Sequence, residues 1–100
     1  VPPNFFALRQ HEQGLSVEWS KYATPQETRN RFGNPEKYGV MEASSGDVRK
    51  INPLDIRWAP LDDNIAHSEI IGIPRRGALK TRIRKELSSI SKIVIPVPEN

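Results

Sequence analysis

The chain has 100 residues, 36% of them hydrophobic, with a net charge of +3 and no cysteine. This length fits one domain with a modest core, and the absence of cysteine excludes disulfides, thiolate metal sites and a thiol nucleophile. No apolar run approaches the roughly 20 residues of a membrane span. We therefore expect a single cytoplasmic domain over residues 1–100, with Val1–Asn4 and Pro98–Asn100 as loose ends and no membrane partner.

Two runs near the start of the chain have the character of strands. Phe5–Leu8 is short and apolar. Leu15, Val17 and Trp19 alternate with polar residues, the period of two that a half-buried strand shows. The polar segment Gln10–Gly14 ends in glycine and predicts a turn, so we expect the two runs to pair as a hairpin.

Residues 24–27, with the sequence TPQE, have the form of a capping box. The Thr24 hydroxyl can accept a hydrogen bond from the third helical amide, while the Glu27 carboxylate reaches back to the Thr24 amide. Proline suits the first helical position. A helix over residues 25–32 is predicted, closed by Gly33 and the following Asn-Pro.

The middle of the chain predicts short elements. Tyr38–Ala43 indicates a strand, followed by a turn at Ser44–Gly46. Asp47–Ile51 fits either one helical turn or the return strand of a hairpin. Leu54–Trp58 alternates in polarity, which predicts another half-buried strand before a loop at Pro60–Asn64.

The last third contains the clearest helix. Ile65–Ile73 is apolar without a clean period, and we expect a short helix or turn there, with a strand as the alternative. In Gly77–Ser91 the apolar residues recur at helical spacing, within about 80° on a helical wheel. Ile93–Val97 is a last short strand, which its prolines end or confine to a sheet edge.

Together these elements predict an α+β fold. We expect a small, mainly antiparallel sheet of four to five strands, with the long C-terminal helix packed on it and one or two short helices. Trp19 and Trp58 both continue the apolar side of an alternating strand, so we expect both indoles in the core.

Two segments resemble a group of small, mostly bacterial proteins of undefined function. The first is Leu8-Arg9 with Glu12-Gln13-Gly14-Leu15-Ser16-Val17-Glu18-Trp19, and the second is residues 64–74, which contain Ala66-His67-Ser68-Glu69-Ile70. The resemblance covers about a fifth of the chain. It implies no activity, cofactor or catalytic residue, although it places His67 inside the second shared segment.

Residues 75–92 hold seven basic residues against one acidic, a net +6, whereas the rest of the chain sums to −3. Arg75 and Arg76 stand at the start of the predicted helix, where the positive end of the helix dipole disfavours cations. A bound phosphate or partner carboxylate would relieve that conflict. These two residues, followed by Lys80, Arg82 and Arg84, are candidates for an anion or nucleic-acid site. The alternative is a solvated helix face.

Two motifs that suggest other chemistry fail on their spacing. Residues 72–81, GIPRRGALKT, lack the Lys-Ser/Thr directly after the second glycine that a phosphate-binding loop needs. His67, Ser68 and Glu69 are adjacent and point in different directions, so they cannot form a catalytic chain among themselves. His67 stays a weak catalytic candidate that needs partners from elsewhere. No cofactor and no metal are expected.

Three functions fit these observations. The leading hypothesis is a non-enzymatic interaction module that binds a protein or a nucleic acid, the latter through the basic helix 75–92. The alternative is a small hydrolase or nuclease that uses His67 with carboxylates, and the third is a structural piece of a larger assembly; self-association stays open. A cleft at His67 would favour the enzyme, a flat basic helix face a nucleic acid, and an exposed apolar edge a protein partner.

Overall fold

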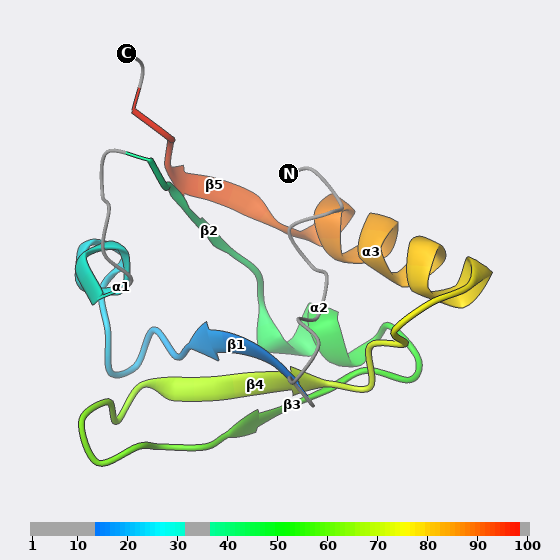
Figure 1. The fold of residues 1–100 in the computed structure, drawn as a ribbon, viewed down its shortest axis with the longest axis horizontal. Coiled ribbons are helices and arrows are strands. Elements are labelled where there is room, and N and C mark those ends of the chain that lie inside the picture. The colour runs from blue at the N-terminus through cyan, green and yellow to red at the C-terminus, as the bar shows by residue number, and fades with distance from the viewer. Residues whose placement is uncertain (1–13, 32–36, 99–100) are drawn as a thin grey trace.

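The computed structural model describes residues 14–31 and 37–98 (Figure 1). Its elements, in chain order, are β1 (Gly14–Glu18), α1 (Pro25–Arg31), β2 (Val40–Glu42), α2 (Ser45–Arg49), β3 (Asp55–Trp58), β4 (His67–Ile71), α3 (Ala78–Ile90) and β5 (Lys92–Ile95). Four predictions lie outside the described residues: the strand Phe5–Leu8 with its hairpin, the helix end at residues 32–33, and the loose ends Val1–Asn4 and 99–100.

The five strands form two antiparallel sheets (Figure 1). One has the order β1-β4-β3, with Glu18 opposite His67 and Trp58 opposite Ser68. The other contains β2 and β5. The predicted α+β class with antiparallel pairing is therefore confirmed, while the strands are divided between two sheets instead of forming one.

Residues 67–71 form the central strand of the larger sheet, so the helix or turn preferred for Ile65–Ile73 is wrong and the strand alternative is right. Ser68 and Ile70 are buried, and His67, Glu69 and Ile71 are only partly so. Burial therefore alternates from one residue to the next along β4. Polarity does not follow this alternation, because the polar Ser68 lies on the inner face and the apolar Ile71 on the outer one.

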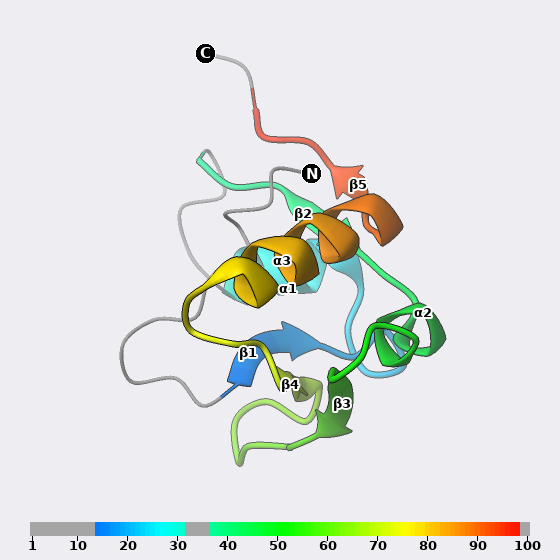
Figure 2. The same ribbon diagram turned by 90° about the vertical axis from the view of Figure 1, so that its right-hand side faces the viewer.

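The core lies between the three-stranded sheet and the helices α2 and α3 (Figure 2). Ile83 and Leu87 of α3 are fully buried and pack with Val48 of α2 and Ile70 of β4. The predicted helix of residues 77–91 is confirmed, although Leu79 at its start stays 43% exposed. Of the two alternatives for Asp47–Ile51, the helical one is right, because residues 47–49 lie in α2. Among the described residues, no helix has the length and apolarity needed to span a membrane.

The capping box of α1 is formed as predicted. The backbone N–H of Glu27 donates to Thr24 Oγ1 at 3.2 Å, and the backbone N–H of Thr24 donates to Glu27 Oε1 at 3.0 Å. The Thr24 backbone N–H, and after it the Thr24 hydroxyl, stabilise the Glu27 carboxylate and hold the pKa of Glu27 below its ordinary value. The carboxylate's contribution to stability is thus complete above the ordinary glutamate pKa and is lost as the pH falls through the lowered value.

Replacing Thr24 by alanine is expected to lower the free energy of unfolding by about 1 kcal/mol, because it removes the acceptor for a first-turn amide. Urea denaturation of the variant and the wild type measures the difference. Thr24→Ser, which keeps the hydroxyl, is the matched control and should stay close to the wild type. An unchanged midpoint in Thr24→Ala would show that α1 does not depend on its cap.

Candidate functional site

A large cavity lies between the two sheets. Its volume is about 900 Å³, within the range of pockets that bind small molecules. Leu15 and Val17 of β1, Ile70 of β4 and Leu87 of α3 give it an apolar interior, and a set of serines adds hydroxyl groups: Ser16, Ser20, Ser44, Ser45, Ser68 and Ser91. The cavity thus combines an apolar interior with hydrogen-bonding groups.

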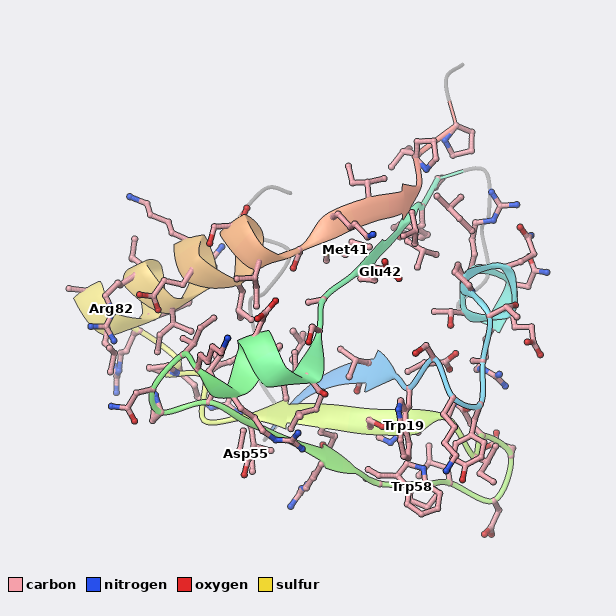
Figure 3. All side chains as sticks on the ribbon, turned by 180° about the vertical axis from the view of Figure 1, so that it is seen from behind. Trp19, Met41, Glu42, Asp55, Trp58 and Arg82 are labelled. Atoms are coloured by element: carbon pink, nitrogen blue, oxygen red, sulfur yellow. The ribbon has the colours of Figure 1, made fainter. Side chains whose placement is uncertain are left out.

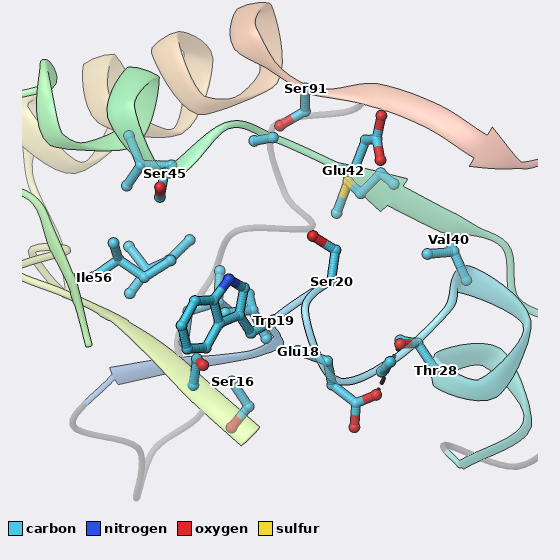
Figure 4. A pocket seen from close by; sticks show the side chains of 18 of the residues that line it. Ser16, Glu18, Trp19, Ser20, Thr28, Val40, Glu42, Ser45, Ile56 and Ser91 are labelled. Carbon is cyan, nitrogen blue, oxygen red and sulfur yellow. Dashed lines mark hydrogen bonds between the residues drawn. The ribbon is translucent and has the colours of Figure 1, made fainter. Parts of the chain in front are cut away.

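Two strand edges border this cavity. Every residue of β1 from Leu15 to Glu18 and every residue of β2 lines it, and Figure 4 shows the two strands on opposite sides of the space. Within the described part of the chain, β1 pairs only with β4 and β2 only with β5. Each strand therefore turns an unpaired edge toward the cavity.

The backbone groups on the free edge of β1 can be identified from the register. The Trp19 N–H donates to the Ala66 carbonyl of the loop before β4 at 2.8 Å. Residues of an antiparallel strand direct their N–H and C=O alternately to one side and the other. Leu15 and Val17 therefore face β4 like Trp19, and the N–H and C=O of Ser16 and Glu18 face away from it.

Three aromatic side chains gather at one end of the cavity, and the predicted burial of Trp19 and Trp58 is wrong. Their exposed fractions are 41% and 47%. The ring centroids of Trp19 and Tyr22 are 5.3 Å apart, those of Trp19 and Trp58 are 5.9 Å apart, and Tyr22 stacks on Trp58 at 5.6 Å. Lys21 Nζ lies 5.2 Å from the Trp19 ring centroid. We call these four residues the aromatic cluster.

The alternation that predicted the core face of these strands is nevertheless correct. Ile56 and Trp58 of β3 pair with Ile70 and Ser68, the two buried residues of β4. The indoles are exposed because α2 and α3 cover the other end of this sheet face (Figure 3). Trp58 Nε1 donates to the Ile65 carbonyl at 2.7 Å, which fixes its ring, while the indole of Trp19 extends into the cavity (Figure 4).

A buried carboxylate anchors β1 beside the cavity. The Glu18 side chain is only 2% exposed, and Arg31 Nε lies 2.7 Å from its Oε2. Thr28 Oγ1 donates to Oε1 at 2.8 Å (Figure 4), and Asn64 Nδ2 donates to Oε2 at 2.6 Å. Both oxygens are therefore occupied by donors from α1 and from the loop before β4. Glu18 therefore has a structural role: it links β1 to α1 and to the loop before β4.

Three arginines line the cavity, and two of them are paired. Arg49 Nε donates to Asp55 Oδ1 at 3.0 Å, and Arg57 Nη2 donates to Glu69 Oε1 at 3.0 Å. The Ile56 backbone N–H and the Arg49 guanidinium hold the pKa of Asp55 below its ordinary value, so Arg49 keeps its partner at neutral pH. The third, Arg29, has a buried Nε for which the described residues provide no hydrogen-bond acceptor.

The predicted basic site lies elsewhere. Arg75 and Arg76 precede α3, and Lys80, Arg82 and Arg84 lie on it; these five residues are not among those that line the cavity. Arg82 Nη2 donates to the Asn52 carbonyl at 3.4 Å, and its Nε lies 4.0 Å from Glu86. Figure 3 places Arg82 and the Trp19–Trp58 pair at opposite ends of the molecule. The anion site at these residues stays a prediction.

His67 is held by the backbone. Its Nδ1 lies 2.7 Å from the Ala59 carbonyl oxygen, which can only accept, so Nδ1 carries a proton and donates to it. Ser68 faces the opposite side of β4 and donates to the Ala66 carbonyl at 3.2 Å. Glu18, opposite His67 in the register, has both oxygens engaged. The described residues contain no group of three or more His, Asp or Glu that could hold a metal ion.

Sequence reasoning missed the cavity and Arg29, because the lining comes from segments far apart in the chain. No family model matches this chain, and neither a curated protein nor a solved structure matches it significantly. The resemblance of residues 8–19 and 64–74 to a group of small proteins therefore stays a prediction, and function has to be argued from the cavity and its edges.

Proposed function

We propose that this protein is a binding module that takes up an extended segment of a partner protein between β1 and β2. One observation carries the proposal: among residues 14–31 and 37–98, two strand edges that no other strand pairs with border the same cavity of about 900 Å³. An unpaired edge offers a row of N–H and C=O groups that an added strand can satisfy.

The free edge of β1 sets how the segment would pair. The backbone groups of Ser16 and Glu18 point away from β4, so an added strand hydrogen bonds to these two residues. Because a strand rises about 3.3 Å per residue, the five residues of β1 match a segment of similar length. Alternate side chains of that segment would enter the apolar interior beside Leu15, Val17 and Leu87.

The aromatic cluster supplies an anchor at the end of this groove. Trp19 extends into the cavity and keeps 41% of its surface exposed. Exposed tryptophan and tyrosine side chains are enriched among residues that dominate binding energy at interfaces. A side chain of the segment that covers Trp19 would bury apolar surface that is otherwise in contact with water.

Single-stranded nucleic acid is the second candidate, favoured by the exposed aromatic cluster with Lys21 above two rings. Bases stack on such rings, and cations contact the backbone phosphates. The basic segment 75–92 was predicted to supply those cations, yet Arg82 lies at the opposite end of the molecule from the two tryptophans (Figure 3). The arrangement therefore favours the protein segment.

The proposal is tested with a displayed library of random octapeptides selected against the wild-type protein. Synthetic copies of the selected peptides are titrated while tryptophan fluorescence is followed, since Trp19 borders the cavity. Each peptide amide is then methylated in turn. In strand pairing only alternate amides point to β1, so methylation should weaken binding at every second residue.

A proline at Ser16 provides the matching change in the protein. Ser16→Pro removes an outward N–H and places the ring where the added strand would lie, while the bonds to β4 come from the intervening residues. Peptide binding should fall about tenfold or more. Ser16→Ala keeps the N–H and should bind like the wild type. The absence of selected binders, an effect of methylation without the two-residue period, or binding of single-stranded DNA or RNA alone would overturn the proposal.

A further inference from the structure

Arg29 occupies the face of α1 that is turned to the cavity. Pro25, Thr28 and Arg29 line the cavity, and their spacing of three and four residues places them on one side of the helix. Thr28, next to Arg29, is fixed on this side by its bond to Glu18 (Figure 4). Arg29 is thus held on a positioned helix face.

Arg29 lacks the carboxylate partner that three other described arginines have close to Nε. Two arginines donate from Nε to a carboxylate oxygen, Arg49 to Asp55 at 3.0 Å and Arg57 to Glu69 at 3.2 Å. A third, Arg31, forms an ion pair with Glu18, its Nε lying 2.7 Å from Oε2. Arg29 Nε is shielded from solvent, and among the described side chains it is the one buried polar atom without a hydrogen-bond partner.

The Nε of an arginine always carries its proton in proteins, so this buried atom cannot resolve the deficit by losing it. It needs an acceptor, and the cavity it lines is the space from which an acceptor can come. A carboxylate presents two oxygens in the plane that matches the guanidinium fork. The other cavity arginines, Arg49 and Arg57, are already satisfied by protein carboxylates.

From these observations, and resting on the proposed function, we infer that Arg29 binds a carboxylate of the inserted segment, so that the partner segment is acidic at the residue beside α1. The carboxylate comes either from an Asp or Glu side chain or from the C-terminus of the segment. This assigns Arg29 as the specificity-determining residue of the groove. The net charge of +3 on the chain is consistent with an acidic partner.

The test uses the peptides selected by the octapeptide library on the wild-type protein. They should share an acidic residue at one position or require a free C-terminus, and two synthetic arms separate these sources: Glu→Gln at the shared position and amidation of the C-terminus. The arm that removes the bound carboxylate should weaken binding about 10- to 100-fold. Arg29→Gln should weaken the acidic peptide equally, and the two changes combined should weaken it no further.

Two controls separate a binding residue from a structural one. Lys50→Gln also removes one positive charge, but from a side chain that is 82% exposed and does not line the cavity, so peptide affinity should change less than about twofold. Arg29→Met should leave the melting temperature unchanged or raise it, since the buried Nε has no partner among the described residues to lose. A lowered melting temperature would show that Arg29 serves the fold and would overturn the inference.

Failure of this inference is distinct from failure of the proposed function. Peptides that bind with the two-residue methylation period but carry no acidic group, or that ignore Arg29→Gln, would overturn the Arg29 assignment and leave strand addition intact. Tighter binding of a phosphoserine peptide than of its glutamate counterpart would replace the carboxylate by a phosphate and also overturn it. Loss of the methylation period itself would overturn both.

Discussion

Replacing Glu18 by alanine is expected to lower the free energy of unfolding by about 3 kcal/mol, the lower end of the range for removing one partner of a buried ion pair. Its side chain is 2% exposed, accepts hydrogen bonds from Thr28 and Asn64, and forms an ion pair with Arg31. The truncation leaves these donors without an acceptor. The effect stays at the lower end because Arg31 is 36% exposed and can turn to water. Urea denaturation measures the loss.

Glu18→Gln is the informative control, because the geometry allows an amide to satisfy the same network. With its oxygen at the Oε2 position, glutamine would still accept from Arg31 and Asn64. Its NH₂ group would then face the Thr28 hydroxyl, which can reverse and accept. We expect Glu18→Gln to lose about half as much as Glu18→Ala, since only the charge assistance is removed. Equal losses would contradict this account of the network.

Replacing Gly72 by alanine is expected to cost about 3 kcal/mol. Gly72 has φ 95°, where an L side chain is strained by roughly 1–2 kcal/mol. A Cβ there would also stand 2.6 Å from the Pro53 carbonyl oxygen and 3.4 Å from Leu54 Cα. The backbone cannot shift freely, because Leu54 is 5% exposed and belongs to the core. The overlap adds about 1–3 kcal/mol.

Gly77→Ala is the matched control for this second prediction. Gly77 has φ 93°, almost the same as Gly72, but a Cβ there meets nothing within 4 Å. The variant therefore reports backbone strain without overlap. Gly77 is also the N-cap of α3, where alanine is disfavoured, which makes the control stringent. Thermal and urea denaturation should place Gly72→Ala clearly below Gly77→Ala, and equal destabilisation would show that the contact with Pro53 is relieved at no cost.

The sequence by itself determined the elements whose stabilising contacts are local. The capping box of α1 joins residues three apart, and the buried stripe of α3 follows from a period of 3.6 residues. The alternation in β1 and β3 likewise identified the face that each strand buries. Because these features depend only on residues close together in the chain, a short segment of sequence is enough to predict them.

Tertiary structure alone decided the identity of β4, the division into two sheets and the exposure of the tryptophans. The strand β4 gains its bonds from β1 and β3, residues distant in the chain, and this pairing overrides an ambiguous local pattern. Trp19 and Trp58 lie on the predicted face, but whether a residue on that face is covered depends on where α2 and α3 end.

The same reason explains why the candidate site was not predicted. Asn64 reaches Glu18 across 46 residues of sequence, and the cavity that holds Arg29 is enclosed by segments from β1 to β5. The sequence instead predicted a site at the basic residues 75–92, because the net charge of a segment can be counted without a structure. Within the described part of the chain, Arg29 Nε has no acceptor and two strand edges have no paired strand. Only the folded structure shows which polar groups are left without a partner, because the possible partners come from distant segments.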